Sequence, residues 1–130
     1  MGCSGGMTLR SLLVDDNARF LDAARELLER EGIDVVGVAM TGADAARLAG
    51  ALRPDVCLID IDLGDESGFD LARRLADRGD DAPHVVLISA YPERDFLEMI
   101  ADSPAVGFLP KPEISAARIH ALLAADAGAV

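Results

Sequence analysis

Five short apolar runs recur along the chain, and each is apolar at consecutive positions rather than at alternate ones. Consecutive apolar residues are typical of strands that are covered on both faces, as in a parallel sheet. The segments between the runs carry apolar residues three or four positions apart, which predicts helices. This alternation predicts one α/β domain, a doubly wound (βα)₅ fold with helices on both faces of a parallel five-stranded sheet. The five runs are residues 12–14, 35–39, 56–59, 85–88 and 106–109.

Polar residues mark where the helices begin. Ser, Thr and Asn are preferred caps because their side chains accept hydrogen bonds from the free N–H groups of a first helical turn. Pro92 suits the first turn of a fourth helix that carries Phe96 and Ile100. Gly32 suits the end of the first helix. The predicted caps are Asn17, Thr41, Ser67 and Ser115, the last between Ile114 and Ile119 at the spacing of a hydrophobic staple.

Composition excludes several function classes. Apolar residues make up 51% of the 130 residues, which is enough for the core of one domain. The net charge of −11 argues against direct binding of nucleic acid, whose phosphates select basic surfaces. No apolar run has the length of a membrane span, and no export leader is present, so we expect a cytoplasmic protein. We interpret Cys57 as a buried structural thiol.

We expect three segments along the chain. Residues 1–7, which include Cys3, are interpreted as a flexible leader or an expression remnant, residues 8–125 as the domain, and residues 126–130 as a C-terminal tail. The small residues of that tail leave two interpretations open. The domain stands alone, which we favour, or the tail is the start of a linker to an output domain.

Four of the five predicted strands lead into a polar or charged residue. Asp15 and Asp16 follow the first run, Asp60 the third, Ser89 the fourth, and Lys111 comes just after the fifth. Any one of them is explained equally well as a cap or turn residue. Ligands of doubly wound sheets bind beyond the carboxyl ends of the strands, however, and all these residues fall at that edge. Their joint placement predicts a site.

The residue types at this edge suit phosphoryl transfer. Carboxylates forced together need a hard cation, and Mg²⁺ takes one or two carboxylates plus phosphate oxygens. A carboxylate such as Asp60 can attack phosphorus to give an acyl phosphate. The remaining task is to neutralise the phosphoryl oxygens, which a metal ion, the Lys111 ammonium and the Ser89 hydroxyl can share.

Four stretches that include these residues resemble the response-regulator receiver domains of bacterial two-component systems, and the resemblance extends from Leu9 to about Ala125. The resemblance implies a flavodoxin-like fold with strand order 2-1-3-4-5. It also implies a phospho-accepting signalling switch that is not an enzyme beyond its own phosphorylation and dephosphorylation. The matching stretches are residues 13–17, 54–63, 87–90 and 107–112.

The same resemblance implies a role for each residue of the site. Asp60 is the expected phosphoacceptor, Lys111 its counter-cation and Ser89 the hydroxyl that moves to the phosphoryl group. Phe108 occupies the position of the switch aromatic, which turns inward when that hydroxyl moves. The expected Mg²⁺ site consists of Asp16 as direct ligand, Asp15 acting through water, Asp60 and the backbone carbonyl of Asp62. A cis peptide bond is expected between Lys111 and Pro112.

The resemblance also implies partners. We expect a histidine kinase or phosphotransfer protein to donate the phosphoryl group. We expect a downstream protein target or an output domain to receive the signal, and a phosphorylation-dependent homodimer is a further option. No membrane partner is expected.

Four positions depart from the commonest family pattern. Gly64 stands where a proline is common, which predicts a more mobile loop, and Phe108 replaces the commoner tyrosine. Asp62 adds a fourth carboxylate to the edge, and Tyr91 puts an aromatic ring near the path of attacking water. We expect Asp62 and Tyr91 to tune the lifetime of the phosphorylated form.

Two alternatives remain at this stage. Asp60-Ile61-Asp62 also resembles the D-x-D nucleophile motif of haloacid-dehalogenase-type phosphatases, although that motif follows a first strand and belongs to longer chains. A pseudo-receiver, which binds proteins without taking phosphate, is the other. Its mark would be the loss of Asp60, Lys111 or the acidic pair, and all of these are present.

Overall fold

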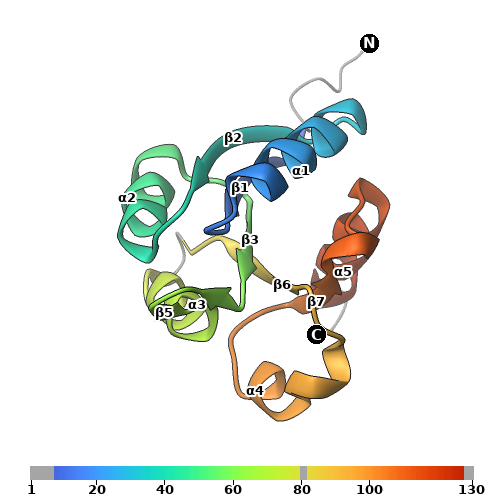
Figure 1. Cartoon of the computed structure of the whole chain (residues 1–130). Coiled ribbons are helices and arrows are strands. Elements are labelled where there is room, and N and C mark those ends of the chain that lie inside the picture. Colours follow the sequence, from blue (N-terminus) through green and yellow to red (C-terminus); the bar gives the residue numbers. More distant parts are fainter. Residues whose placement is uncertain (1–7, 80–81, 128–130) are drawn as a thin grey trace.

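A computed structural model describes residues 8–79 and 82–127, and its centre is one parallel sheet (Figure 1). The strand order is β2-β1-β3-β6-β7, and all four neighbouring pairs are parallel. Counting these five strands in chain order gives 2-1-3-4-5, so the predicted fold class is confirmed. The strands are β1 (Arg10–Val14), β2 (Asp34–Ala39), β3 (Val56–Asp60), β6 (His84–Ser89) and β7 (Gly107–Pro110).

Helices cover both faces of this sheet, so the core has two halves. Helices α1 (Ala18–Arg30) and α5 (Ala116–Ala127) pack on one face. Helices α2 (Gly42–Leu52) and α3 (Gly68–Ala76) pack on the other. Successive residues of a strand alternate between the two halves: in β3, Leu58 joins the first cluster and Ile59 the second. Because both faces are covered, every residue of β3 is buried, which explains its uninterrupted apolar run.

The predicted caps begin the helices. Asn17 Oδ1 accepts hydrogen bonds from the backbone N–H groups of Arg19 and Phe20, at 3.0 and 3.2 Å. The other caps accept bonds in the same way, which satisfies donors that a helix end leaves free. Gly32 follows α1 with a φ of 93°, a conformation that glycine adopts without strain. The other acceptors are the hydroxyls of Thr41, Ser67 and Ser115.

The fourth helix differs from the prediction because it is divided. Residues Glu93–Phe96 form a 3₁₀ turn, η3, and α4 covers only Leu97–Ala101. Phe96 leaves the helical conformation, with φ −131° and ψ 16°, and no side-chain hydrogen bond caps either piece. Pro92 precedes the turn in an extended conformation. Phe96 and Ile100 nevertheless pack against the core.

A short hairpin follows the third strand and was not predicted. Strands β4 (Asp62–Leu63) and β5 (Glu66–Ser67) pair antiparallel across a two-residue turn. Gly64 opens this turn with a φ of 77°, where glycine is the favoured residue and where proline, with φ near −65°, cannot stand. Glu66 Oε2 accepts a hydrogen bond of 2.9 Å from the backbone N–H of Gly42 and so ties the hairpin to the start of α2.

The described part of the chain covers only some of the predicted segments. The proposed leader, residues 1–7 with Cys3, lies outside it, as do residues 128–130 of the proposed tail. Within the described ranges, no helix is both long enough and apolar enough to cross a membrane. Cys57 is fully buried, and burial raises the pKa of its thiol to about 12, so it is an unreactive core residue.

Candidate functional site

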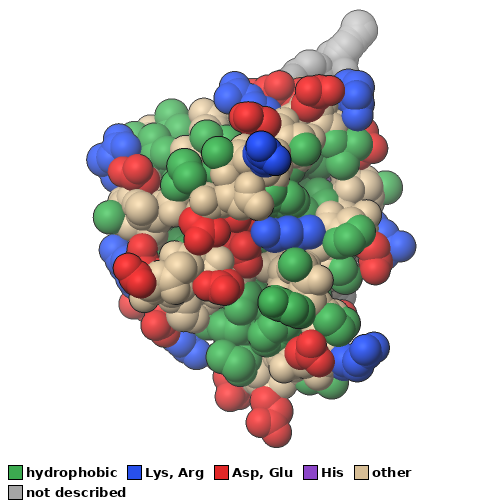
Figure 2. Space-filling view, in the orientation of Figure 1, with side chains coloured by type: hydrophobic (Ala, Val, Ile, Leu, Met, Phe, Trp, Pro, Cys, Tyr) green, Lys and Arg blue, Asp and Glu red, His purple; other side chains and the backbone are tan. Residues whose placement is uncertain are grey.

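The carboxyl ends of four strands bring the predicted site residues together around one pocket of about 370 Å³. Figure 2 shows acidic side chains gathered near the centre of this face, beside a basic one. Asp60 ends β3 and Ser89 ends β6, while Asp15 and Asp16 directly follow β1 and Lys111 directly follows β7. All predicted site residues except Phe108 line this pocket: Asp15, Asp16, Asp60, Asp62, Ser89, Tyr91 and Lys111.

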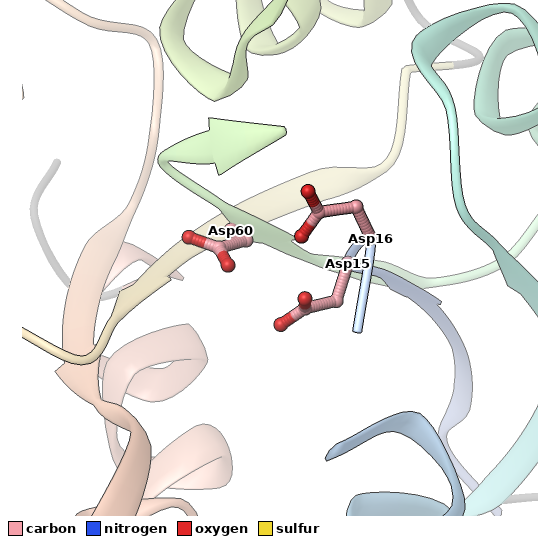
Figure 3. Close-up of side chains that lie close together, drawn as sticks. All are labelled: Asp15, Asp16 and Asp60. Carbon is pink, nitrogen blue, oxygen red and sulfur yellow. The ribbon is translucent and has the colours of Figure 1, made fainter. Parts of the chain in front are cut away.

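Three of the carboxylates converge. Asp15, Asp16 and Asp60 each offer one oxygen, and these oxygens all lie within 4.8 Å of one another. Figure 3 shows the three side chains directed toward a common space from the ends of two neighbouring strands. Asp15 is 0% exposed and Asp60 6%, whereas Asp16 is open to solvent. Two buried carboxylates this close require a compensating positive charge.

Lys111 supplies that charge. Its Nζ lies 2.7 Å from Asp15 Oδ2 and 3.0 Å from Asp60 Oδ2, so one ammonium bridges two carboxylates. The side chain is only 18% exposed. Its Nζ also lies 4.4 Å from the centroid of the Phe20 ring. The spacing of Phe20, Ala24 and Leu27 indicates only that Phe20 lies on the apolar face of the first helix. No local pattern indicates that its ring reaches a lysine beyond β7.

Asp15, Asp60 and Ser89 each use one side-chain oxygen to fix the turn that follows their strand. Asp15 Oδ1 accepts a hydrogen bond from the N–H of Asn17 at 2.8 Å, and Asp60 Oδ1 accepts one from Asp62 at 3.0 Å. Ser89 Oγ accepts one from the N–H of Tyr91, also at 3.0 Å. Such local bonds favour the present side-chain orientations. They leave the second oxygen of Asp15 and of Asp60 directed toward Lys111.

The ionisation of Asp60 is unfavourable in this environment. Burial raises the pKa of its carboxyl, and the charge of Asp15 raises it further. The N–H of Asp62 and the Lys111 ammonium oppose the rise without cancelling it. Burial lowers the pKa of Lys111, but the bonds and charges of the two carboxylates outweigh this effect and leave that pKa raised. Lys111 is therefore charged at neutral pH, and the site still carries surplus negative charge.

The donor set fits a hard divalent cation. Asp15 Oδ2 is fully buried and receives no well-directed hydrogen bond, so only the 2.7 Å ion pair with Lys111 compensates it within the described residues. Three carboxylates against one ammonium leave the cluster net negative. Oxygen ligands with spare negative charge are what Mg²⁺ prefers. The arrangement therefore suits a magnesium ion on the solvent side, where Asp16 is exposed.

The remaining predicted residues surround this centre. Phe108 in β7 is buried, and its ring centroid lies 6.3 Å from that of Phe96. Tyr91 is 62% exposed at the mouth of the pocket. Asp62 is also exposed, and its Oδ1 accepts a 3.0 Å bond from the N–H of Gly64. Asp62 therefore stabilises the hairpin turn and is not part of the three-carboxylate cluster.

The expected cis bond between Lys111 and Pro112 is wrong for this structure, because no described peptide bond is cis. Residues Lys111–Glu113 instead form a 3₁₀ turn, η4. The N–H of Ile114 donates to the carbonyl of Lys111 at 3.3 Å across this turn. The helical turn accommodates Pro112 in the trans form at its second position.

Comparison with known proteins identifies the family. The sequence profile of the response regulator receiver domain matches residues 12–124. The chain belongs to this family. Receiver domains are the phospho-accepting signalling switches of two-component systems. The haloacid-dehalogenase motif follows a first strand, whereas Asp60 ends β3, so the family match favours the receiver interpretation over that alternative.

Individual relatives agree with the family. The transcriptional regulatory protein PdtaR of Mycobacterium tuberculosis is 33% identical over 79% of this chain and 49% of its own length. A protein-glutamate methylesterase/protein-glutamine glutaminase of Myxococcus xanthus is 37% identical over 80% of this chain but only 30% of its own. The chain therefore spans about half of the length of these curated relatives or less. The match does not assign the activities of the whole relatives to this chain.

Solved structures place the same family in the same fold. The receiver domain of the response regulator NarL from M. tuberculosis has a TM-score of 0.76 at 31% identity, covering 93% of this chain and 98% of that one. A LuxR-family two-component response regulator from Aurantimonas sp. SI85-9A1 has a TM-score of 0.79 at 28% identity, covering 93% and 86%.

Proposed function

We propose that this domain takes one phosphoryl group on Asp60 from a histidine kinase or phosphotransfer protein, with Mg²⁺ bound beside it. The phosphorylated domain then signals to a downstream protein target or an output domain. The observation that carries the proposal is the bridge from Lys111 Nζ to Asp60 Oδ2 at 3.0 Å, inside a cluster of three carboxylates. A pseudo-receiver has no need to bury Asp60 beside Asp15, where its ionisation is unfavourable, and to compensate both carboxylates with one lysine.

Each residue of the site has its own role in the proposed phosphoryl transfer. Asp60 Oδ2 is the attacking atom, because Oδ1 is already held by the N–H of Asp62. Lys111 keeps its charge and neutralises one phosphoryl oxygen, and Ser89 Oγ donates to another after its side chain turns toward the site. A bound Mg²⁺ would neutralise phosphoryl charge. Asp16 would hold it directly, Asp15 through water, and Asp60 and the carbonyl of Asp62 would complete the protein contacts.

We extend the proposal to the rest of the domain. Residues 8–125 form the receiver, and the transfer of phosphate to and from its own aspartate is the only chemistry it performs. It works in the cytoplasm and does not bind nucleic acid itself, in keeping with the net charge of −11. Phe108, already buried against Phe96, reports the state of Ser89 to β7 and to the surface around α4. A homodimer formed on phosphorylation is one way to use that surface.

The direct test uses a small-molecule phosphodonor, which needs no partner protein. We expect the wild-type chain to gain the mass of one phosphoryl group when incubated with an acyl phosphate or a phosphoramidate and Mg²⁺. The gain should disappear when a chelator removes the metal, because the cluster then keeps its surplus negative charge. Intact-mass spectrometry measures both. An unmodified protein at saturating donor and metal would refute the proposed function.

Metal binding should also change stability in a way that depends on Asp60. The pKa of Asp60 is raised in the folded chain, so ionising it destabilises the fold. This cost begins as the pH rises above the unfolded pKa and is complete above the folded one. At neutral pH without metal, Asp60→Asn should therefore melt at a higher temperature than wild type. Mg²⁺ should raise the melting temperature of wild type and raise that of Asp60→Asn less.

Thermal melts of both proteins, with chelator and with excess Mg²⁺, check this prediction. Glu66→Gln, outside the cluster, serves as a charge-removal control because it can keep the bond to Gly42. A metal-free Asp60→Asn variant that melts below wild type would contradict the electrostatic argument.

The lifetime of the phosphorylated form should depend on Tyr91 and Asp62. Tyr91 stands at the pocket mouth, where its ring can shield phosphorus from water. We expect Tyr91→Ala to hasten dephosphorylation about tenfold, the scale on which misplaced water alters a barrier. Asp62→Asn should hasten it too, by removing a charge that repels hydroxide. Decay is measured in both single variants and the double variant. Wild-type decay in Tyr91→Ala contradicts the shielding role, and simple additivity shows that the two act independently.

A further inference from the structure

Phe20 lies where the first helix meets the site. It belongs to the first turn of α1, and its backbone N–H donates to the cap residue Asn17 at 3.2 Å. Asp15 and Asp16 come immediately before this cap. The Phe20 side chain is half-buried and packs against the hydrophobic cluster of the α1–α5 face. Its ring is therefore held by the core on one side and reaches toward the charged centre on the other.

The ring completes the surroundings of the Lys111 ammonium. An ammonium has three N–H donors. Asp15 Oδ2 at 2.7 Å and Asp60 Oδ2 at 3.0 Å occupy two directions, and the Phe20 centroid lies 4.4 Å away as a third partner. This distance is well inside the roughly 6 Å over which a cation over an aromatic face is attracted. Such contacts strengthen when water is excluded, and the Lys111 side chain is only 18% exposed.

The Lys111 ammonium needs a third contact to fix its position. The ammonium is a compact charge on a flexible four-carbon stem, so two carboxylates alone leave it free to pivot between them. When Asp60 receives a phosphoryl group, the bond from Asp60 Oδ2 to Nζ must give way to a bond with a phosphoryl oxygen. Phe20 is held by α1 and the hydrophobic cluster rather than by either carboxylate, so we expect its ring to stay in place during this exchange.

Packing alone is the competing explanation. Phe20 also lines an apolar groove with Ala23, Leu27 and Pro112, where any apolar side chain of similar size would serve. The two explanations make different predictions. Packing requires volume, which leucine supplies, whereas attraction of the ammonium requires an aromatic face.

We propose that Phe20 is a positioning residue whose ring holds the Lys111 ammonium against Asp60, ready to meet the incoming phosphoryl group. This proposal deepens the proposed function and rests on it. The chain offers a precise way to observe the ammonium, because Lys111 is its single lysine. Protein made with isotope-labelled lysine therefore gives the NMR signals of that one side chain.

The kinetic experiment compares Phe20→Leu, which keeps the volume, with Phe20→Tyr, which keeps the ring. With a small phosphodonor and saturating Mg²⁺, Phe20→Leu should lower the phosphorylation rate constant roughly five- to thirty-fold, the factor that a desolvated cation–π contact is worth. Phe20→Tyr should keep the rate constant within about twofold of the wild-type value. Leu27→Ala, in the same groove and about two turns further along the same face of α1, controls for loss of packing. A wild-type rate in Phe20→Leu overturns the proposal.

A double-mutant cycle separates the ammonium from the rest of the site. In a Lys111→Met background, Phe20→Leu should have no further effect on the rate. The same fold-loss in both backgrounds would show that Phe20 acts through packing and would overturn the proposal. The Mg²⁺ affinity of Phe20→Leu should not fall, because Lys111 is not a metal ligand. A fall in parallel with the rate would mean that the whole site is disordered, which also overturns it.

NMR tests independently whether the Phe20 ring orders the Lys111 side chain. Relaxation of the Lys111 Cε and Nζ signals should show an ordered side chain in wild type and Phe20→Tyr and a mobile one in Phe20→Leu. Equal order in all three overturns the proposal. If the wild type takes no phosphoryl group at all, the proposed function fails, and these signals still show whether the ring holds the ammonium.

Discussion

Asp60→Asn should abolish phosphorylation by a small phosphodonor, while Asp62→Asn should leave the protein phosphorylated. Both residues line the same pocket and are two positions apart in the chain. The same Asp→Asn substitution at each position therefore provides a matched comparison. Of these two residues, Asp60 is the buried one, and Lys111 Nζ lies 3.0 Å from its Oδ2. The carboxylate of Asp62 is exposed and accepts a bond within its own turn. Asparagine has no carboxylate oxygen with which to attack phosphorus, so the expected loss is complete.

Intact mass, followed by digestion and mapping, checks this expectation. The wild-type chain and Asp62→Asn should each carry one phosphoryl group, and Asp60→Asn none. Thermal melting of the three proteins confirms that the loss is chemical rather than a loss of fold. Phosphorylation of Asp60→Asn to the wild-type extent would show that another residue is the acceptor.

The sheet and the position of the site could be predicted because both depend on simple rules. Strands covered on both faces must be apolar at every position, which is why β3 and β6 stand out as continuous runs. Parallel strands share one carboxyl edge, so residues far apart in sequence, such as Asp15, Asp60 and Lys111, were expected to meet there. They do so within hydrogen-bonding distance.

Other features escaped prediction for physical reasons. The hairpin β4–β5 has two residues in each strand, too few for a periodic pattern, and Gly64 indicates only a turn. The division between η3 and α4 depends on the local conformation of Phe96, which packing determines. The contact of Phe20 with Lys111 joins two segments distant in sequence, and it depends on how α1 lies on the sheet. Non-local side-chain contacts of this kind leave no trace in local periodicity.

The close approach of α3 to the acceptor strand is another non-local feature, and it gives the second large prediction. Gly68, the first residue of α3, donates its backbone N–H to the carbonyl of Ile61 at 2.7 Å. A Cβ at this position would overlap the carbonyl oxygen of Asp60, and it would lie 2.9 Å from the Cα of Ile61. These are backbone atoms of the acceptor segment, so no side-chain rotation can relieve the overlap.

Gly68→Ala should therefore destabilise the domain and also impair phosphorylation. Forcing a methyl group into closely packed backbone costs about 1 to 3 kcal/mol of the free energy of unfolding. The same shift moves Asp60 relative to Lys111 and Ser89, and a misplacement of about 1 Å can lower a rate roughly 100-fold. Urea denaturation measures the first effect, and the rate of phosphorylation by a small donor, under conditions where the variant is folded, measures the second.

Gly50→Ala provides the matched control for this substitution. Gly50 lies inside α2, and a Cβ there meets only the guanidinium tip of Arg78, at 3.0 Å, which a flexible side chain can withdraw. Alanine is favoured over glycine in helix interiors by about 0.5 to 1 kcal/mol, so Gly50→Ala should be as stable as wild type or more so. Its phosphorylation rate should be unchanged. If Gly68→Ala behaves like Gly50→Ala in both measurements, the approach of α3 to the acceptor strand does not constrain the site. If Gly68→Ala loses rate while keeping its stability, the backbone shift is confined to Asp60, and the position of that one residue accounts for the loss.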